Sequence, residues 1–125
     1  MAFAVCIPGR PLLRDFTPLS ATHAVADVPD AHSIHELAFF ILPETPLPPG
    51  LAASLHVSAD PFTDWTLLAT VSNAAPSAIA LVRLPSPVPP SSVLRLGVAL
   101  EPDTGAGAGG LASPGWLAGD GAAAA

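Results

Sequence analysis

The chain has 125 residues, half of them hydrophobic and only 11% charged, which is enough for one domain with a core of its own. Four arginines and no lysine face ten acidic residues, giving a formal charge of −6. The chain therefore lacks the basic face with which proteins bind nucleic acid or an anionic membrane. Sixteen prolines recur along it and exclude a helical bundle, because a proline inside a helix costs about 3 kcal/mol.

Short strands joined by proline turns fit this composition, and seven or eight are predicted. In chain order they cover residues 3–7, 12–17, 22–28, 37–42, 51–58, 65–71, 78–84 and 93–100. Cap-type residues at 30–33 predict one helical turn. Leu51, Leu55 and Val57 alternate with Ser54, His56 and Ser58, so we expect one inward face there. The spacing predicts an all-β fold, an antiparallel sandwich or barrel.

Composition changes near residue 102. Residues 1–102 are expected to form the β domain, and residues 103–125 are rich in glycine and alanine. This low-complexity tail has too few large side chains to offset its ordering entropy, so we expect it to have no fold. Its single aromatic residue, Trp116, is either solvated or a short docking motif. The proline-rich stretches 43–50 and 85–90 are expected to be stiff, extended connections.

The location of the protein follows from its only cysteine and from its N-terminus. Cys6 cannot form an internal disulfide, which favours a reducing compartment. The apolar run at residues 2–7 has no basic residue before it and does not resemble a secretory signal. We therefore expect a soluble protein inside the cell.

Motifs for catalysis are weak. The densest polar cluster, residues 27–36, contains Asp27, Asp30, His32, His35 and Glu36. It is either a divalent metal site or a solvated turn, and its spacing matches no metal motif. No serine lies in a Gly-x-Ser-x-Gly elbow, and Cys6 in its apolar strand is expected to be an inert thiol. We predict no enzyme and no cofactor, and a binding module remains.

Such a module would bind its partner through apolar side chains and proline segments rather than through charges. Four aromatic residues are candidates for the wall of a partner-binding pocket, with Pro46, Pro48 and Pro49 as its rim; they are Phe39, Phe40, Phe62 and Trp65. The alternative is that the aromatic residues form ordinary core. Phe39 and Phe40 are adjacent on one strand and point to opposite faces, so one of them is expected in the core and the other on the second face or under a loop.

Three segments resemble one family. Val-Ala-Asp-Val-Pro-Asp at 25–30 resembles the Val/Leu-Pro-Asp signature of the Hikeshi (OPI-ten-like) nuclear import carriers. Residues 39–50 resemble the apolar strand and proline-rich glycine turn of that family. Residues 65–79 are similar to its Trp-x-Leu-Leu-Gly-x-Val-x-Asn-x-x-Pro-Ser-Ala-Ile block. The resemblance covers roughly residues 4–101, the N-terminal domain of the family.

This resemblance implies a β-sandwich of jelly-roll type. It also implies a function: carriage of the ATP-bound seventy-kilodalton heat-shock chaperone into the nucleus during heat stress, through binding to that chaperone and to the Phe-Gly repeats of nucleoporins. Such a protein would shuttle between cytoplasm and nucleus.

Two departures from the family pattern lead to further expectations. The segment 84–91 is short and has no aromatic residue, whereas the family has a long loop with a Phe-Gly element there, so we expect weaker nucleoporin binding. The tail stands in place of the family's C-terminal helical domain, which makes a dimer doubtful. The alternative function is a truncated β-sandwich interaction module that has lost transport activity.

Overall fold

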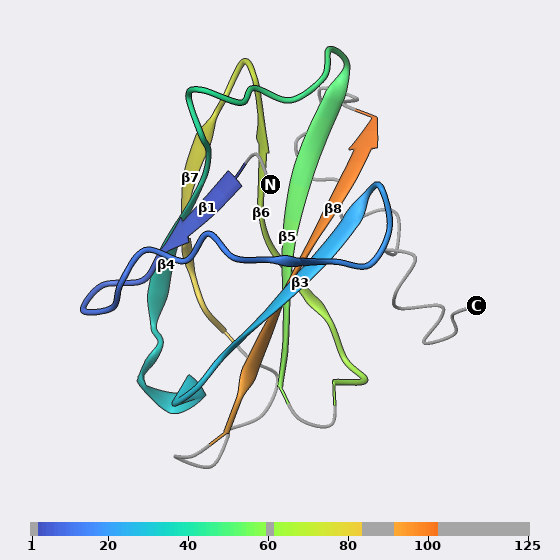
Figure 1. The fold of residues 1–125 in the computed structure, drawn as a ribbon. Coiled ribbons are helices and arrows are strands. Elements are labelled where there is room, and N and C mark those ends of the chain that lie inside the picture. The colour runs from blue at the N-terminus through green and yellow to red at the C-terminus, as the bar shows by residue number, and fades with distance from the viewer. Residues whose placement is uncertain (1–2, 60–61, 84–91, 103–125) are drawn as a thin grey trace.

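The computed structural model describes residues 3–59, 62–83 and 92–102, apart from the side chain of His32. They form two antiparallel sheets packed face to face (Figure 1). One sheet has the order β1 (Phe3–Cys6), β4 (Glu36–Ile41), β7 (Ser77–Leu81). The other has the order β2 (Thr17–Pro18), β3 (His23–Val28), β8 (Leu94–Pro102), β5 (Leu51–Ala59), β6 (Thr66–Ser72). The predicted antiparallel β-sandwich is confirmed.

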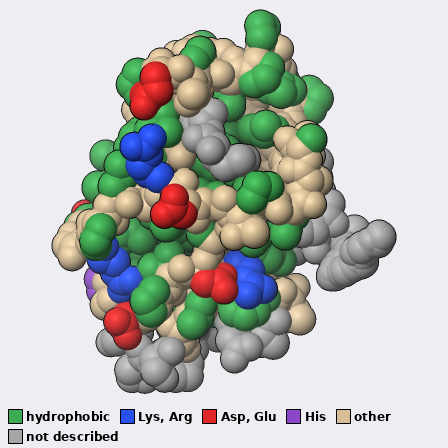
Figure 2. All heavy atoms as spheres, viewed as in Figure 1, with side chains coloured by type: hydrophobic (Ala, Val, Ile, Leu, Met, Phe, Trp, Pro, Cys, Tyr) green, Lys and Arg blue, Asp and Glu red, His purple; other side chains and the backbone are tan. Residues whose placement is uncertain are grey.

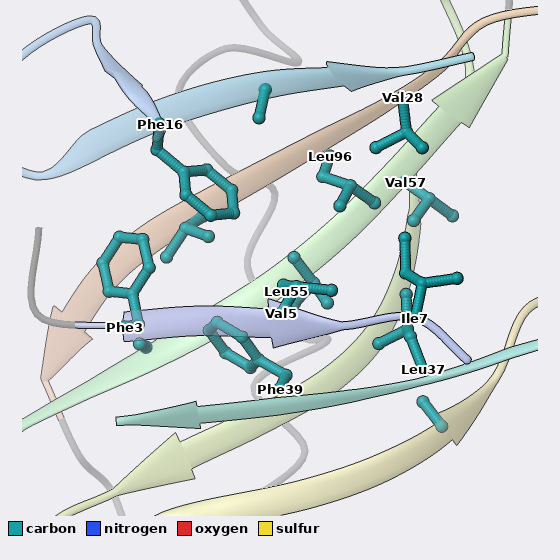
Figure 3. Packing of buried hydrophobic residues seen from close by; sticks show 14 of the residues in the cluster. Phe3, Val5, Ile7, Phe16, Val28, Leu37, Phe39, Leu55, Val57 and Leu96 are labelled. Atoms are coloured by element: carbon teal, nitrogen blue, oxygen red, sulfur yellow. The ribbon is translucent and has the colours of Figure 1, made fainter. Parts of the chain in front are cut away.

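The core lies between the sheets and follows from the alternation along each strand. Leu94, Leu96 and Val98 on β8 are buried on its inner face, as a period of two requires. Close-packed aromatic rings fill one end of the core. The ring of Phe3 lies 5.2 Å from that of Phe16 and 5.9 Å from that of Phe39, measured between centroids (Figure 3). The Phe3–Phe16 pair meets edge to face and the Phe3–Phe39 pair is tilted, and both distances are favourable for aromatic rings.

β5 is an inner strand of the larger sheet, paired with β8 on one side and with the edge strand β6 on the other. Leu55 and Val57 point into the core, as predicted, whereas Leu51 at the start of the strand is half-buried and lies outside the core cluster. The opposite face carries Ser54, His56 and Ser58, and these side chains are buried as well. Alternation predicts which side chains share a face, but it does not reveal that both faces of a strand are covered.

Two expectations about the first part of the chain are wrong. The strand expected at 12–17 is reduced to a single bridge between Val5 and Leu13 and to the two residues of β2. Between these points Phe16 turns inward and is buried against Phe3, so the segment cannot continue the ladder. Cys6 was expected in an apolar environment, but it is exposed because it lies on the outer face at the end of β1.

The turns between strands agree better with expectation. Ala31–Ser33 form one turn of 3-10 helix, preceded by Asp30 in the left-handed region at φ 55°. This turn is the only helix among residues 3–59, 62–83 and 92–102, and no helix there is long and apolar enough to span a membrane. The whole stretch 85–90, the last residue expected in strand 78–84, and the tail 103–125 with Trp116 lie outside the described residues.

Candidate functional site

The structure resolves the choice between the two adjacent phenylalanines. Phe39 is 0% exposed and belongs to the core. Phe40 is half-buried on the outer face of the three-stranded sheet, where its register partners are Ala4 on β1 and Ser77 on β7. Of the pair, Phe40 alone is placed to touch a partner.

Phe62 and Trp65 lie in the connection between β5 and β6, and both are half-buried. Phe62 has a positive φ of 65°, unusual for an aromatic residue, and its N–H donates to the carbonyl oxygen of Ala59 at 2.7 Å. Its ring packs against the guanidinium of Arg95 at 4.0 Å from the centroid. A cation over an aromatic face is stabilised by the ring quadrupole, so this ring already has a partner within the chain.

Arg95 is held in turn by Asp27 on the neighbouring strand. Its Nε and one terminal nitrogen donate to the two carboxylate oxygens at 2.8 and 3.1 Å. The hydrogen bond from Arg95 lowers the pKa of Asp27, and the same bond raises the pKa of Arg95. Phe62, Arg95 and Asp27 thus form one fixed cluster on the outer face of the larger sheet.

The three prolines of the predicted rim, Pro46, Pro48 and Pro49, are exposed in the connection between β4 and β5. Between them Leu47 is buried. The side-chain amide of Asn73 bonds to both backbone groups of Leu47. The Leu47 N–H donates to Asn73 Oδ1 at 3.0 Å, and Asn73 Nδ2 donates to the Leu47 carbonyl oxygen at 2.8 Å. Asn73 and Leu47 therefore fix the position of the proline segment.

The structure does not bring the predicted residues into one pocket. The proline segment enters β5 at Leu51, whereas Phe62 and Trp65 follow its other end at Ala59. Nine residues of strand separate the two groups by about 25 Å. Phe40 lies near the proline end, because Ile41 N–H donates to the Pro76 carbonyl oxygen in the turn that also carries Asn73. The role of these residues in binding remains a prediction.

An apolar groove that the sequence analysis missed lies between the β1–β2 connection and the end of β3. Its volume is about 240 Å³, and it is lined by Ile7, Arg10, Pro11, Leu13, Asp27, Val28 and Pro29. It shares Leu13 and Asp27 with a more polar hollow of about 310 Å³, whose other lining residues are Asp15, Thr17, Val25, Ala26 and Arg95. Drug-sized ligands occupy pockets of about 300–1,000 Å³, so the apolar groove suits one side chain of a partner.

Arg10 connects the two segments that form this groove. Its guanidinium donates to the carbonyl oxygens of Pro29 at 2.6 Å and Asp30 at 3.0 Å, and to Ser33 Oγ at 2.9 Å. These contacts join positions about twenty residues apart, a pairing that no local pattern indicates. Figure 2 shows the acidic and basic side chains of one face scattered among hydrophobic ones, so no single charged patch dominates it.

The polar cluster at residues 27–36 is divided by its contacts. Asp27 binds Arg95, while Asp30 occupies the left-handed position before the 3-10 turn. Across the described ranges, no group of three or more His, Cys, Asp and Glu side chains is arranged to hold a metal ion. The side chain of His32 lies outside the described residues. Nothing in the described geometry supports the metal hypothesis.

His56 is the most strongly perturbed titratable group. It is 5% exposed on the second face of β5, and burial lowers its pKa to about 4. Burial also lowers the pKa of His23, against an opposing effect of Glu101. Ser54 Oγ donates to Glu101 on the same face. Because the His56 ring lies beneath the surface, its titration affects stability more directly than binding.

Residues 6–92 match the family described as the Hikeshi-like, N-terminal domain. The chain belongs to the Hikeshi-like family. It is 29% identical over 124 residues to the protein named OPI10 homolog of Anopheles gambiae, an alignment that covers 82% of this chain and 62% of the relative. It is 26% identical to the protein of that name from Aedes aegypti, covering 82% and 61%. This Hikeshi-like chain therefore spans about three fifths of the length of the curated relatives that it matches.

Proposed function

We propose that this chain is a non-catalytic transport adaptor that binds short apolar elements of its partners. In this proposal it binds the ATP-bound seventy-kilodalton heat-shock chaperone and the Phe-Gly repeats of nucleoporins, and it shuttles between cytoplasm and nucleus during heat stress. Family membership supports the class of function. The observation that carries the binding mode is the apolar groove of about 240 Å³ at Leu13 and Val28.

The size of the groove agrees with the affinity that a carrier needs. One phenylalanine ring entering an apolar groove gains about 1.5–3 kcal/mol from burial. A gain of about 3 kcal/mol corresponds to a Kd weaker than about 1 mM, before association entropy is counted. Each contact would thus be released quickly. Retention would come from many repeats acting together, because linked weak sites raise avidity without slowing each release.

Import of fluorescent chaperone into the nuclei of permeabilised cells, with ATP and the purified chain, tests this function. Leu13→Gln places an amide in the groove, and Leu12→Gln changes the neighbouring side chain, which is 47% exposed and outside the groove. We expect the chain and Leu12→Gln to stimulate import and Leu13→Gln to stimulate it less. Circular dichroism checks that both variants remain folded.

The alternative is an interaction module that keeps the fold and its surfaces but has no transport activity. The short connection between β7 and β8, which lacks the family's aromatic loop, favours it. Binding of the chain to Phe-Gly resin with no stimulation of import over buffer would support this module. Absence of both binding and import would refute the two proposals together.

A further inference from the structure

β7 is an edge strand whose outer backbone groups have no strand partner among the described residues. It pairs only with β4 there, in the register Leu37 to Ala80 and Phe39 to Ala78. Ile41 N–H donates to the Pro76 carbonyl oxygen and Val82 N–H to the His35 carbonyl oxygen, each at 2.8 Å. In an antiparallel pair the bonded positions alternate. The even-numbered residues of β7 therefore bond to β4, and the N–H and C=O groups at 77, 79 and 81 point outward.

The side chains along this open edge are apolar and exposed. Ile79 is 79% exposed and Leu81 is 54% exposed. They lie on the outer face of the sheet, where Ala38 is the register partner of Ile79 and Phe40 is the partner of Ser77. Ala78 and Ala80 point to the core instead. The backbone edge and the apolar stripe at Ile79, Leu81 and Phe40 thus occupy the same side of the molecule.

Proteins usually protect such an edge with a lysine, a proline, a bulge or a very short strand. β7 (Ser-Ala-Ile-Ala-Leu) contains no charge and no proline, and its pairing with β4 has no bulge. By contrast, β2, an edge strand of the other sheet, has two residues and ends in Pro18. β7 therefore keeps the features of a template to which another strand can add.

We propose that the open edge of β7 binds an uncharged, extended segment of a partner protein by strand addition. The N–H and C=O groups of Ile79 and Leu81 would bond to the backbone of the segment, and apolar side chains at its alternate positions would pack beside Ile79 and Phe40. Strand addition takes affinity from the backbone and specificity from alternate side chains. The choice of partner rests on the proposed function, whereas the edge is a property of the fold.

Area and charge favour a partner segment over a second copy of the chain. Two strands of five residues, paired edge to edge, cover far less than the total of about 1,200 Å² that a stable dimer buries, whereas a weakly bound, quickly released segment needs no such area. Two copies would also bring together two formal charges of −6. The charges near the edge are one of each sign, Glu36 opposite Leu81 and Arg83 just beyond it, so a neutral segment meets no net repulsion there.

Amide hydrogen exchange by NMR on the full chain tests the proposal, with the synthetic peptide Gly-Ser-Phe-Ser-Phe-Gly-Ser as the probe. In the free chain we expect fast exchange at Ile79 and Leu81 and protection at Ala78 and Ala80. Saturating peptide should protect Ile79 and Leu81. Ile79→Pro removes an outward N–H without touching the bonds to β4, and should weaken peptide binding about five-fold, the effect of one lost hydrogen bond. Leu19→Lys, at an exposed leucine away from β7, should leave binding unchanged.

Peptide binding that leaves the amides of Ile79 and Leu81 unprotected would overturn the proposal. Ile79→Lys is a second variant, which should fold because the side chain that it replaces is already mostly exposed. Undiminished peptide binding in Ile79→Lys would also overturn the proposal. Protection that grows with chain concentration in the absence of peptide would assign the edge to a second copy and also overturn it. The import assay gives a separate answer. Import without edge protection refutes only strand addition, and edge protection without import refutes only transport.

Discussion

Buried His56 should make the fold less stable in mildly acidic solution. Its pKa is about 4 in the folded chain, because burial disfavours the charged ring, and 6.5 is the ordinary value expected when the chain unfolds. Between these values the unfolded chain binds a proton that the folded chain excludes. The free energy of unfolding should be highest above about pH 6.5 and fall as the pH is lowered toward about 4. The full difference is at most about 3 kcal/mol.

Urea unfolding followed by circular dichroism, from about pH 7.5 to about pH 4.5, measures this effect. His56→Gln should flatten most of the decline. His23→Gln is the matched control, because burial also lowers the pKa of this neighbouring ring, so the two variants separate the contribution of His56 from that of His23. The lowered pKa of Asp27 acts at lower pH and stays outside this window. An equal decline in the chain and in His56→Gln would refute the assignment of the effect to this ring.

Three further predictions concern residues of the candidate surfaces. Phe39→Ala should lower the free energy of unfolding by about 3–5 kcal/mol and Phe40→Ala by about 1 kcal/mol, since only Phe39 is core; equal losses in urea titrations would contradict the placement of the two rings. Asn73→Ala should lower the free energy of unfolding by about 1–3 kcal/mol, because the two hydrogen bonds to the Leu47 backbone are lost. Thermal unfolding that matches that of the unmodified chain would show that these two bonds do not stabilise the fold. Asp27→Asn should lower the free energy of unfolding by less than about 1 kcal/mol, because the ion pair with Arg95 is partly exposed. A loss several times larger in urea titrations would contradict the treatment of this pair as an ordinary surface ion pair.

Much of the fold was predictable because its strands obey simple periodicity. Leu94, Leu96 and Val98 alternate with smaller or polar residues, and Pro43 ends the apolar run that becomes β4. The segment at 12–17 was not predictable in this way. It has strand-like composition, but Phe16 packs inward on Phe3, a contact that depends on how the two sheets are placed.

The candidate binding surfaces were harder to predict than the strands. Phe39 and Phe40 could be assigned to opposite faces from their adjacency, but which of them was core depended on register with β1 and β7. The groove at Leu13 depends on the contacts of Arg10 with Pro29 and Asp30, which are distant in the sequence. The open edge at Ile79 depends on sheet order, and sheet order is not a local property of any strand.

The central claim is that the apolar, lightly charged surface of this β-sandwich binds Phe-Gly segments. A titration of the full chain with a Phe-Gly peptide, followed residue by residue through backbone NMR shifts, tests it most directly. We predict weak, fast-exchange binding, with the largest shifts at Leu13 and Val28 in the groove and at Ile79 and Leu81 on the open edge. Shifts spread evenly over the surface, or none at saturating peptide, would contradict the claim.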